Sequence, residues 1–291
     1  MTSPLPSISG LADLAVRYDA VLSDVWGVVH NGVEAFPSAV QALAEFRKAG
    51  GKVVFITNAP RPSGPIIEML DRLGVHREAY DAIVSSGDAT RAMIAKYSGR
   101  AIHHVGPATE DDALYEGLGV RRAGADEAEV VVVTDLDTDD DTPEMYRERA
   151  RHWLSRKLPM ICANPDHLVE RGDDLVYCAG ALAAQYEREG GGVVYAGKPY
   201  PPIYLLALET LSRLAGREIK RSEVLAIGDG VNTDIAGAAA LGIGSVFVAS
   251  GLHVPANSGG DAGSEALDPR HLAELFAQAG RPLAAMQRLA W

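Results

Sequence analysis

The 291-residue sequence predicts an α/β protein in which both ends of the chain build one parallel sheet and the middle forms a second, inserted α/β unit. Short apolar runs alternate with segments of helical periodicity along most of the chain, which is typical of a parallel sheet covered by helices. The pattern changes after residue 86 and resumes after the glycines at 190–192. We therefore expect residues 1–86 and 192–291 to form a core domain and residues 87–191 to form the insertion.

The first part of the core is expected to alternate strand and helix twice. A strand is predicted at 21–23, and a helix at 37–49 runs from a proline that suits its first position to a pair of glycines that ends it. A second strand at 53–56 and a helix around 67–73 follow. The apolar pair at 83–84 then leads to a polar loop with a helix cap, where the chain is expected to leave the core.

The insertion and the second part of the core have fewer but similar signals. Strands are predicted at 130–133 and 159–162, and the acidic segment 135–141 between them is interpreted as a solvated loop. This segment has neither the glycine nor the distal glutamate of an EF-hand calcium loop. The later elements are expected as strands at 193–195, 224–227 and 245–248 and as helices at 203–214 and 234–241.

Composition limits the classes of partner. A net charge of -12 disfavours binding to nucleic acid or to an anionic membrane, because both attract basic surfaces. No apolar run approaches the roughly 20 residues of a membrane-spanning helix. The two cysteines, Cys162 and Cys178, are too few for a disulfide framework and fit a reducing compartment. We expect a cytoplasmic protein that binds a small molecule and acts alone or as a homodimer.

Polar side chains of complementary chemistry follow four of the predicted strands: Asp24, Thr57 with Asn58, Lys198, and Asp229 with Asp234. The carboxyl ends of parallel strands share one edge of a sheet, so residues far apart in sequence can converge there. Two carboxylates suit Mg²⁺, and a hydroxyl and an amide can donate to phosphate oxygens. A lysine can neutralise a carboxylate crowded against a phosphoryl group. The set predicts phosphoryl transfer to a carboxylate nucleophile.

These motifs, in this order, resemble those of the haloacid dehalogenase (HAD) superfamily. The resemblance extends from about Tyr18 to Ala249. The sequence Asn164, Pro165, Asp166 in the insertion resembles the Asn-Pro-Asp signature of the class IIA, NagD-like sugar and nucleotide phosphatases. The resemblance implies a Rossmann-like core with an inserted class II α/β cap domain. It also implies a Mg²⁺-dependent phosphatase that acts on a small phosphorylated metabolite.

The resemblance assigns the metal site and the nucleophile residue by residue. Asp24 matches the aspartate that forms an aspartyl-phosphate and also binds Mg²⁺. The residue two positions later, Trp26, would supply a backbone carbonyl to the metal. Asp229 matches the direct metal ligand, and Asp234 matches the acid that supports the water shell of the metal or the lysine.

The same resemblance assigns the groups that hold the substrate. Thr57 matches the phosphate-binding residue of the second motif, with Asn58 beside it. Lys198 matches the catalytic lysine of the third motif. Asn164 and Asp166 would face the site from the cap, on the side of the leaving group.

Trp26 breaks the pattern of the superfamily, whose phosphatases usually carry a second aspartate at this position. That acid protonates the leaving group and then activates water, and such assistance contributes about 10²–10⁴-fold in rate. An indole can donate a hydrogen bond but cannot act as a base. The backbone carbonyl of Trp26 is unaffected by the change. The sequence therefore predicts intact metal and phosphate binding with impaired or rerouted turnover.

Three interpretations follow from this substitution. In the first, His30 or Asp166 moves the proton instead. In the second, the substrates are activated esters or acyl phosphates, whose leaving groups need little protonation. In the third, the protein is a non-catalytic or weakly catalytic module that binds a phosphorylated ligand.

Overall fold

The computed structural model describes residues 5–107, 111–171, 174–249 and 275–291, and it divides the chain into two compact units. Unit 1 consists of Met1–Thr57, Ile67–Ile83 and Tyr204–Trp291, and unit 2 consists of Asn58–Ile66 and Val84–Ile203. Each unit is taken by itself below. Residues 250–274, which the sequence places in the second part of the core, lie outside the described residues.

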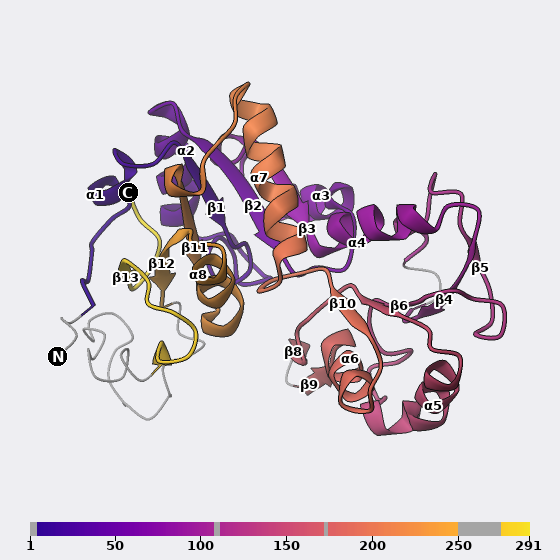
Figure 1. Ribbon diagram of the computed structural model, residues 1–291. Helices are drawn as coiled ribbons and strands as arrows, with labels where there is room; N and C mark the ends of the chain where they lie inside the picture. The colour runs from indigo at the N-terminus through magenta and orange to yellow at the C-terminus, as the bar shows by residue number, and fades with distance from the viewer. Residues whose placement is uncertain (1–4, 108–110, 172–173, 250–274) are drawn as a thin grey trace. The chain divides into compact units, whose positions relative to one another are not determined.

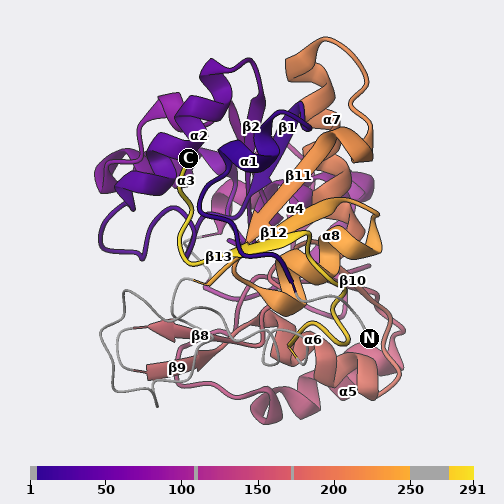
Figure 2. The ribbon, with the colours of Figure 1, turned by 90° about the vertical axis from the view of Figure 1, so that its left-hand side faces the viewer.

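Unit 1 contains a six-stranded sheet with the order β13-β12-β11-β1-β2-β3 (Figure 1). The strands are β1 (Ala20–Ser23), β2 (Lys52–Thr57), β3 (Ala82–Ser85), β11 (Val224–Gly228), β12 (Gly244–Val248) and β13 (Ala284–Met286). The helices are α1 (Ala12–Ala15), α2 (Pro37–Lys48) and α8 (Ala236–Ala240), together with α3 (Ser63–Leu73) and α7 (Pro201–Ala215), whose first residues are assigned to unit 2. Short 3₁₀ turns lie at Arg77–Ala79 and Arg221–Glu223. Figure 2 shows α2 and α3 on one side of the strands and α7 and α8 on the other.

The centre of this sheet is buried on both faces. All residues of β1 and β11 are buried, as expected for parallel strands that helices cover. Ser23 pairs with Ile227 on one side and with Phe55 on the other. From β1, the next strands along the chain, β2 and β3, are added on one side of the sheet. On the other side of β1 the chain continues from β11 to β12 and β13. The topological switch point therefore lies between β1 and β11, and open α/β sheets bind ligands at the carboxyl ends of such strands.

Unit 2 contains a five-stranded sheet with the order β10-β7-β6-β4-β5 and a separate hairpin, β8–β9. The strands are β4 (Ala101–Val105), β5 (Arg121–Arg122), β6 (Val131–Val133), β7 (Met160–Cys162), β8 (Leu168–Arg171), β9 (Asp174–Tyr177) and β10 (Val193–Tyr195). The helices are α4 (Ser86–Ile94), α5 (Arg147–Ser155) and α6 (Ala179–Arg188), with 3₁₀ turns at Ala95–Tyr97, Asp112–Leu114 and Pro143–Tyr146.

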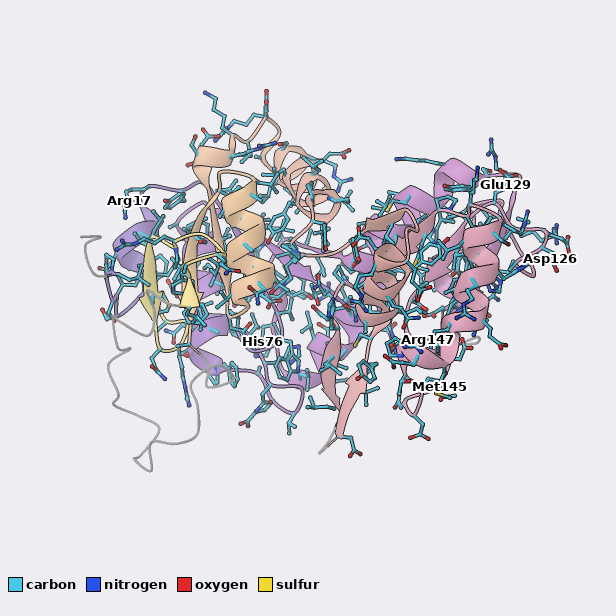
Figure 3. All side chains as sticks on the ribbon, turned by 60° about the horizontal axis from the view of Figure 1, so that its bottom comes forward. Arg17, His76, Asp126, Glu129, Met145 and Arg147 are labelled. Atoms are coloured by element: carbon cyan, nitrogen blue, oxygen red, sulfur yellow. The ribbon has the colours of Figure 1, made fainter. Side chains whose placement is uncertain are left out.

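Alternating side chains of β6 fill two separate cores in unit 2. Val131 and Val133 pack with Trp153 of α5 and with α6, whereas Val132 packs with Ile94 of α4. This division follows from the two-residue period of a strand, which sends successive side chains to opposite faces. Charged side chains such as Asp126 and Arg147 point outward from the surface of unit 2 (Figure 3).

Several elements differ from the sequence-based expectations. Val193–Tyr195 was expected in the core, but as β10 it pairs in parallel with β7 of unit 2. The expected helix at 234–241 begins as a π-helical turn, Val231–Ile235, before α8.

The helix cap expected near residue 85 is observed. The side chains of Ser85 and Asp88 each accept a hydrogen bond from the other residue's backbone N–H. The limits 87–191 of the insertion remain a prediction.

Candidate active site

Asp24 lies directly after β1, at the carboxyl edge of the sheet in unit 1. Its backbone N–H donates to the carbonyl of Ile227 at 2.8 Å, which extends the pairing of β1 with β11 by one residue. The N–H of Val25 donates to Oδ1 of Asp24 at 2.7 Å, and the hydroxyl of Ser23 donates to its backbone carbonyl at 2.8 Å. The carboxylate is buried, and these bonds orient it at the switch point.

Asp229 and Asp234 come from the turn that follows β11. The side chain of Asp234 accepts hydrogen bonds from the backbone N–H of Gly230 at 3.1 Å and the hydroxyl of Thr233 at 3.4 Å. A Cβ atom on Gly228 would lie 2.2 Å from Cγ of Asp234, so only glycine fits there. The hydroxyl of Tyr204 on α7 donates to the backbone carbonyl of Asp234 at 3.2 Å and so helps to hold this turn in place.

The three buried carboxylates form one cluster, and each of Asp24, Asp229 and Asp234 offers an oxygen within 4.8 Å of the others. At this distance the repulsion between two carboxylates is about 3 kcal/mol for an effective dielectric constant near 20. A cation bound among them converts that repulsion into attraction. Carboxylate oxygens are also the ligands that Mg²⁺ prefers. The donor set therefore fits a hard divalent cation.

Gly27, a residue that was not predicted to belong to the site, permits the close approach of Asp229. Its φ angle is +80°, and a Cβ atom there would lie 2.0 Å from Oδ2 of Asp229. Both facts exclude an ordinary side chain. Its backbone N–H donates to the carbonyl of His30 at 2.7 Å, which closes the turn after Asp24. The only signal in the sequence was a glycine three residues after an acid that ends a strand.

His30 is a packing residue in unit 1. Its side chain is buried, and Nδ1 accepts a hydrogen bond from the N–H of Gly32 at 2.8 Å. Burial lowers the pKa of His30 to about 4, so the ring is neutral near pH 7. The remaining proton is then on Nε2, which has no hydrogen-bond partner in the described part of the chain. This environment argues against His30 as the group that moves a proton to substrate.

Trp26 differs from its neighbours because 43% of it is exposed. It lies in the turn between Asp24 and His30, and it forms an isolated bridge with His30. A Cβ atom on Gly32 would lie 3.4 Å from Nε1 of the indole. A large aromatic surface therefore meets solvent two residues after the candidate nucleophile.

Thr57 ends β2, the strand next to β1. Because Ser23 pairs with Phe55, Asp24 and Thr57 follow the paired residues at the same edge of the sheet. Adjacent strands lie about 4.8 Å apart. Unit 1 thus brings together the five predicted site residues Asp24, Trp26, Thr57, Asp229 and Asp234 at one edge.

The other four predicted site residues, Asn58, Asn164, Asp166 and Lys198, belong to unit 2. The side-chain amide of Asn58 bonds to both backbone groups of Lys198. Its Oδ1 accepts from the N–H at 2.7 Å, and its Nδ2 donates to the carbonyl at 3.1 Å. The same Nδ2 donates to Oδ1 of Asp166 at 2.9 Å. Oδ1 of Asn164 accepts from the N–H of Asp166 at 3.1 Å, so all four are joined by hydrogen bonds.

Comparison with known proteins decides the family. A model of haloacid dehalogenase-like hydrolases matches residues 21–121, and a model of HAD-like hydrolases matches residues 195–279. The crystal structure of a haloacid dehalogenase-like hydrolase from Brucella suis 1330 is 46% identical, with a TM-score of 0.78, and the match covers 84% of this chain and 94% of that one. This chain belongs to the haloacid dehalogenase-like hydrolase family. The α/β fold class that the sequence predicted is thereby confirmed.

Two curated relatives place this HAD-family chain in class IIA, as its motifs predicted. Ribonucleotide monophosphatase NagD of Escherichia coli K12 is 25% identical over 80% of this chain and 88% of its own length. Acid sugar phosphatase of Staphylococcus aureus USA300 is 26% identical over 81% of this chain and 88% of its own length. In the part of the HAD-family chain that the structure describes, no helix is long and apolar enough to cross a membrane.

The geometry at Gly27 predicts a selective loss of metal binding in Gly27→Ala. The new Cβ would collide with Oδ2 of Asp229 and displace a carboxylate of the cluster. Gly50→Ala is the matched control, since Gly50 has a φ angle of +100° but no atom within 4 Å of an added Cβ. Both variants should lose about 1–2 kcal/mol of stability from backbone strain. Only Gly27→Ala should weaken Mg²⁺ affinity in calorimetric titration, and equal affinities in the two variants would contradict this account.

Burial of His30 predicts a loss of stability in mild acid. The pKa of His30 is about 4 in the folded chain and near 6.5 in the unfolded chain, so the unfolded state binds the extra proton between these values. Stability should therefore fall, by up to about 3 kcal/mol, as the pH drops from 6.5 to 4. His30→Asn keeps an acceptor for the N–H of Gly32 but removes the titration, so it should flatten this part of the curve.

Urea unfolding between pH 7.5 and 4.5 measures the effect. His76→Asn is the control for the substitution itself, because His76 is an exposed histidine on unit 1 (Figure 3). An unchanged slope in His30→Asn would show that other groups cause the acid sensitivity.

Proposed function

We propose that this chain is a Mg²⁺-dependent phosphatase that hydrolyses a small phosphorylated metabolite through an aspartyl-phosphate on Asp24. The observation that carries the proposal is the cluster of Asp24, Asp229 and Asp234 at the switch point of a HAD-family sheet. The activities named for its curated relatives, a ribonucleotide monophosphatase and an acid sugar phosphatase, support a sugar or nucleotide phosphate as substrate.

The reaction has two steps, and each uses residues that the chain supplies. In the first, an oxygen of Asp24 attacks phosphorus and the bond from phosphorus to the leaving oxygen breaks, which leaves an acyl phosphate. In the second, water attacks the same phosphorus and releases inorganic phosphate and the free carboxylate. Thr57 donates a hydrogen bond to a phosphate oxygen, and Lys198 neutralises charge on the phosphoryl group. Bound Mg²⁺ would add positive charge at the same oxygens.

Trp26 restricts the substrates that suit this site. Neither the indole of Trp26 nor the buried ring of His30 can protonate a leaving alcohol. Leaving groups that are stable as anions, such as a phenolate or the carboxylate of an acyl phosphate, need no such proton. We therefore propose that the chain hydrolyses activated phosphate esters and acyl phosphates faster than ordinary sugar or nucleotide phosphates, whose leaving group is an alcohol.

A phospholigand-binding module is the second candidate function. Trp26 and His30 favour it, because the chain supplies groups that can bind metal and phosphate, whereas neither of these two side chains can carry a proton to the substrate.

We further propose that the chain works in the cytoplasm, alone or as a homodimer, without nucleic acid or membrane partners. These proposals rest on its acidic net charge and its two cysteines.

Asp24→Asn tests the enzyme proposal. The amide is a poor nucleophile, so Mg²⁺-dependent release of phosphate from p-nitrophenyl phosphate should fall to the level without protein. Asp13→Asn, an exposed carboxylate on α1, serves as the control and should retain full activity. Circular dichroism would confirm that both variants fold. If Asp24→Asn were as active as the parent, the proposed nucleophile would be wrong.

Trp26→Asp tests the leaving-group argument. A carboxylate at this position can donate and accept a proton, so turnover of a sugar or nucleotide phosphate should rise by up to about 10²–10⁴-fold. The gain on p-nitrophenyl phosphate should be smaller, because its leaving group is far more acidic than an alcohol. Trp26→Phe, which changes the ring but adds no proton carrier, should show no gain. Equal gains on both substrates would mean that the indole limits access rather than proton transfer.

A further inference from the structure

The side chain of Asn58 has no hydrogen-bond donor left for a phosphate. An amide NH₂ group carries two hydrogens, and Nδ2 of Asn58 directs them to the carbonyl of Lys198 and to Oδ1 of Asp166. The orientation of the amide is unambiguous, because the N–H of Lys198 can only donate to Oδ1. Asn58 is also buried. Binding of a phosphate oxygen by Nδ2 would require one of these bonds to break.

The amide of Asn58 makes two hydrogen bonds to the backbone of Lys198, in the way that a paired β-strand bonds to its neighbour. One side chain engages both the N–H and the carbonyl of the same residue, at 2.7 and 3.1 Å. This pairing restricts rotation of the Lys198 backbone about both of its flexible bonds. Lys198 is itself buried, so its side chain has little freedom once the backbone is held.

Three segments converge on the preceding residue, Gly197. A Cβ atom there would lie 2.5 Å from Oδ1 of Asn58, 2.7 Å from Cδ of Pro165 and 2.7 Å from the hydroxyl of Ser86. Only a glycine allows all three to approach. The hydroxyl of Ser86 also bonds to the carbonyl of Ala163, one residue before the Asn-Pro-Asp sequence.

Asp166 is held in turn by its own loop and by α6. Its backbone N–H donates to Oδ1 of Asn164 at 3.1 Å, and its carbonyl accepts from the N–H of Gly180 at 3.2 Å. A Cβ atom on Gly180 would lie 2.1 Å from the carbonyl oxygen of Pro165. The loop therefore has little room to move, and its carboxylate anchors the amide of Asn58.

We propose that Asn58 and Asp166 are positioning residues for Lys198, and that the Asn-Pro-Asp sequence serves this purpose rather than contact with the leaving group. The proposal rests on the proposed phosphatase function for its consequence in catalysis. The N–H of Asp166 donates to Asn164, Nδ2 of Asn58 donates to Asp166, and the amide of Asn58 bonds to both backbone groups of Lys198. Bonds to a charged acceptor such as Asp166 are the stronger kind, which suits an anchor.

The kinetic test separates positioning from direct substrate contact. Misplacement of a catalytic group by about 1 Å costs about 10²-fold in rate, so Asn58→Ala should lower kcat by about that factor. KM and inhibition by inorganic phosphate should change little. A direct phosphate ligand would give the opposite result, a raised KM and weaker phosphate inhibition with kcat retained, and that result would overturn the proposal.

The two variants at Asp166 distinguish an anchor from a proton carrier. Asp166→Asn keeps an oxygen that can accept from Nδ2 of Asn58, so it should lose much less activity than Asp166→Ala. If Asp166 moved the proton, both variants would be equally impaired. Asp126→Ala, an exposed carboxylate on the same unit (Figure 3), is the matched control and should behave as the parent. The double variant Asn58→Ala/Asp166→Ala should be no worse than Asn58→Ala alone, whereas multiplied losses would mean that the two residues act independently.

A measurement that needs no activity completes the test. Amide hydrogen exchange resolved to single residues should show the N–H of Lys198 exchanging at least 10-fold faster in Asn58→Ala than in the parent, because its acceptor is removed. The comparison can be repeated in an Asp24→Asn background. Unchanged exchange at Lys198 would overturn the positioning role whatever the kinetics. If the parent showed no Asp24-dependent phosphatase activity, the proposed function would be wrong. Faster exchange at Lys198 in Asn58→Ala would then still support the contact between Asn58 and the Lys198 backbone.

Discussion

Confinement of three carboxylates to one small volume is the constraint on which unit 1 depends. Asp24, Asp229 and Asp234 repel one another, so the fold must hold them by other means. It does so with backbone N–H groups directed at two of them and with glycines at 27 and 228 that leave room for them. The sheet contributes the rest, because its switch point places the ends of β1 and β11 side by side. A cation at this position would relieve this repulsion.

Local elements of the fold could be predicted because their signals are local. The helix expected at 37–49 is observed as Pro37–Lys48, and the strand expected at 53–56 is observed as Lys52–Thr57. Proline, paired glycines and apolar periodicity act within a few residues, so they can be recognised in sequence. The placement of Asp24 and Asp229 after buried strands followed from the same signals. Their chemical roles, and those of the other site residues, remain predictions.

Partners distant in sequence could not be predicted. The apolar run Val193–Tyr195 indicates a strand, but its pairing with β7 depends on the topology of the whole insertion. The strand Ala101–Val105 contains two adjacent histidines, which weakened its apolar signal. Asn58 and Lys198 are 140 residues apart, and no local pattern records that one amide pairs with both backbone groups of the other. The expectation that Asn58 binds phosphate came from the donor chemistry of its amide and from its place beside Thr57, because its partners in the fold cannot be read from the sequence.

Thr57 and Asn58 show how adjacent residues can serve different parts of the chain. Thr57 ends β2 in unit 1, at the edge that carries the carboxylates, whereas Asn58 begins a segment of unit 2 and bonds to Lys198. A single peptide bond therefore links the last residue of β2, the strand next to β1, to a residue that bonds to the backbone of Lys198. Since bond lengths and planarity are nearly invariant, this link limits how far the two polar groups can separate at that point. The order of residues in the second motif thus fixes the spacing of these two neighbouring positions through covalent geometry, in addition to any chemistry of their side chains.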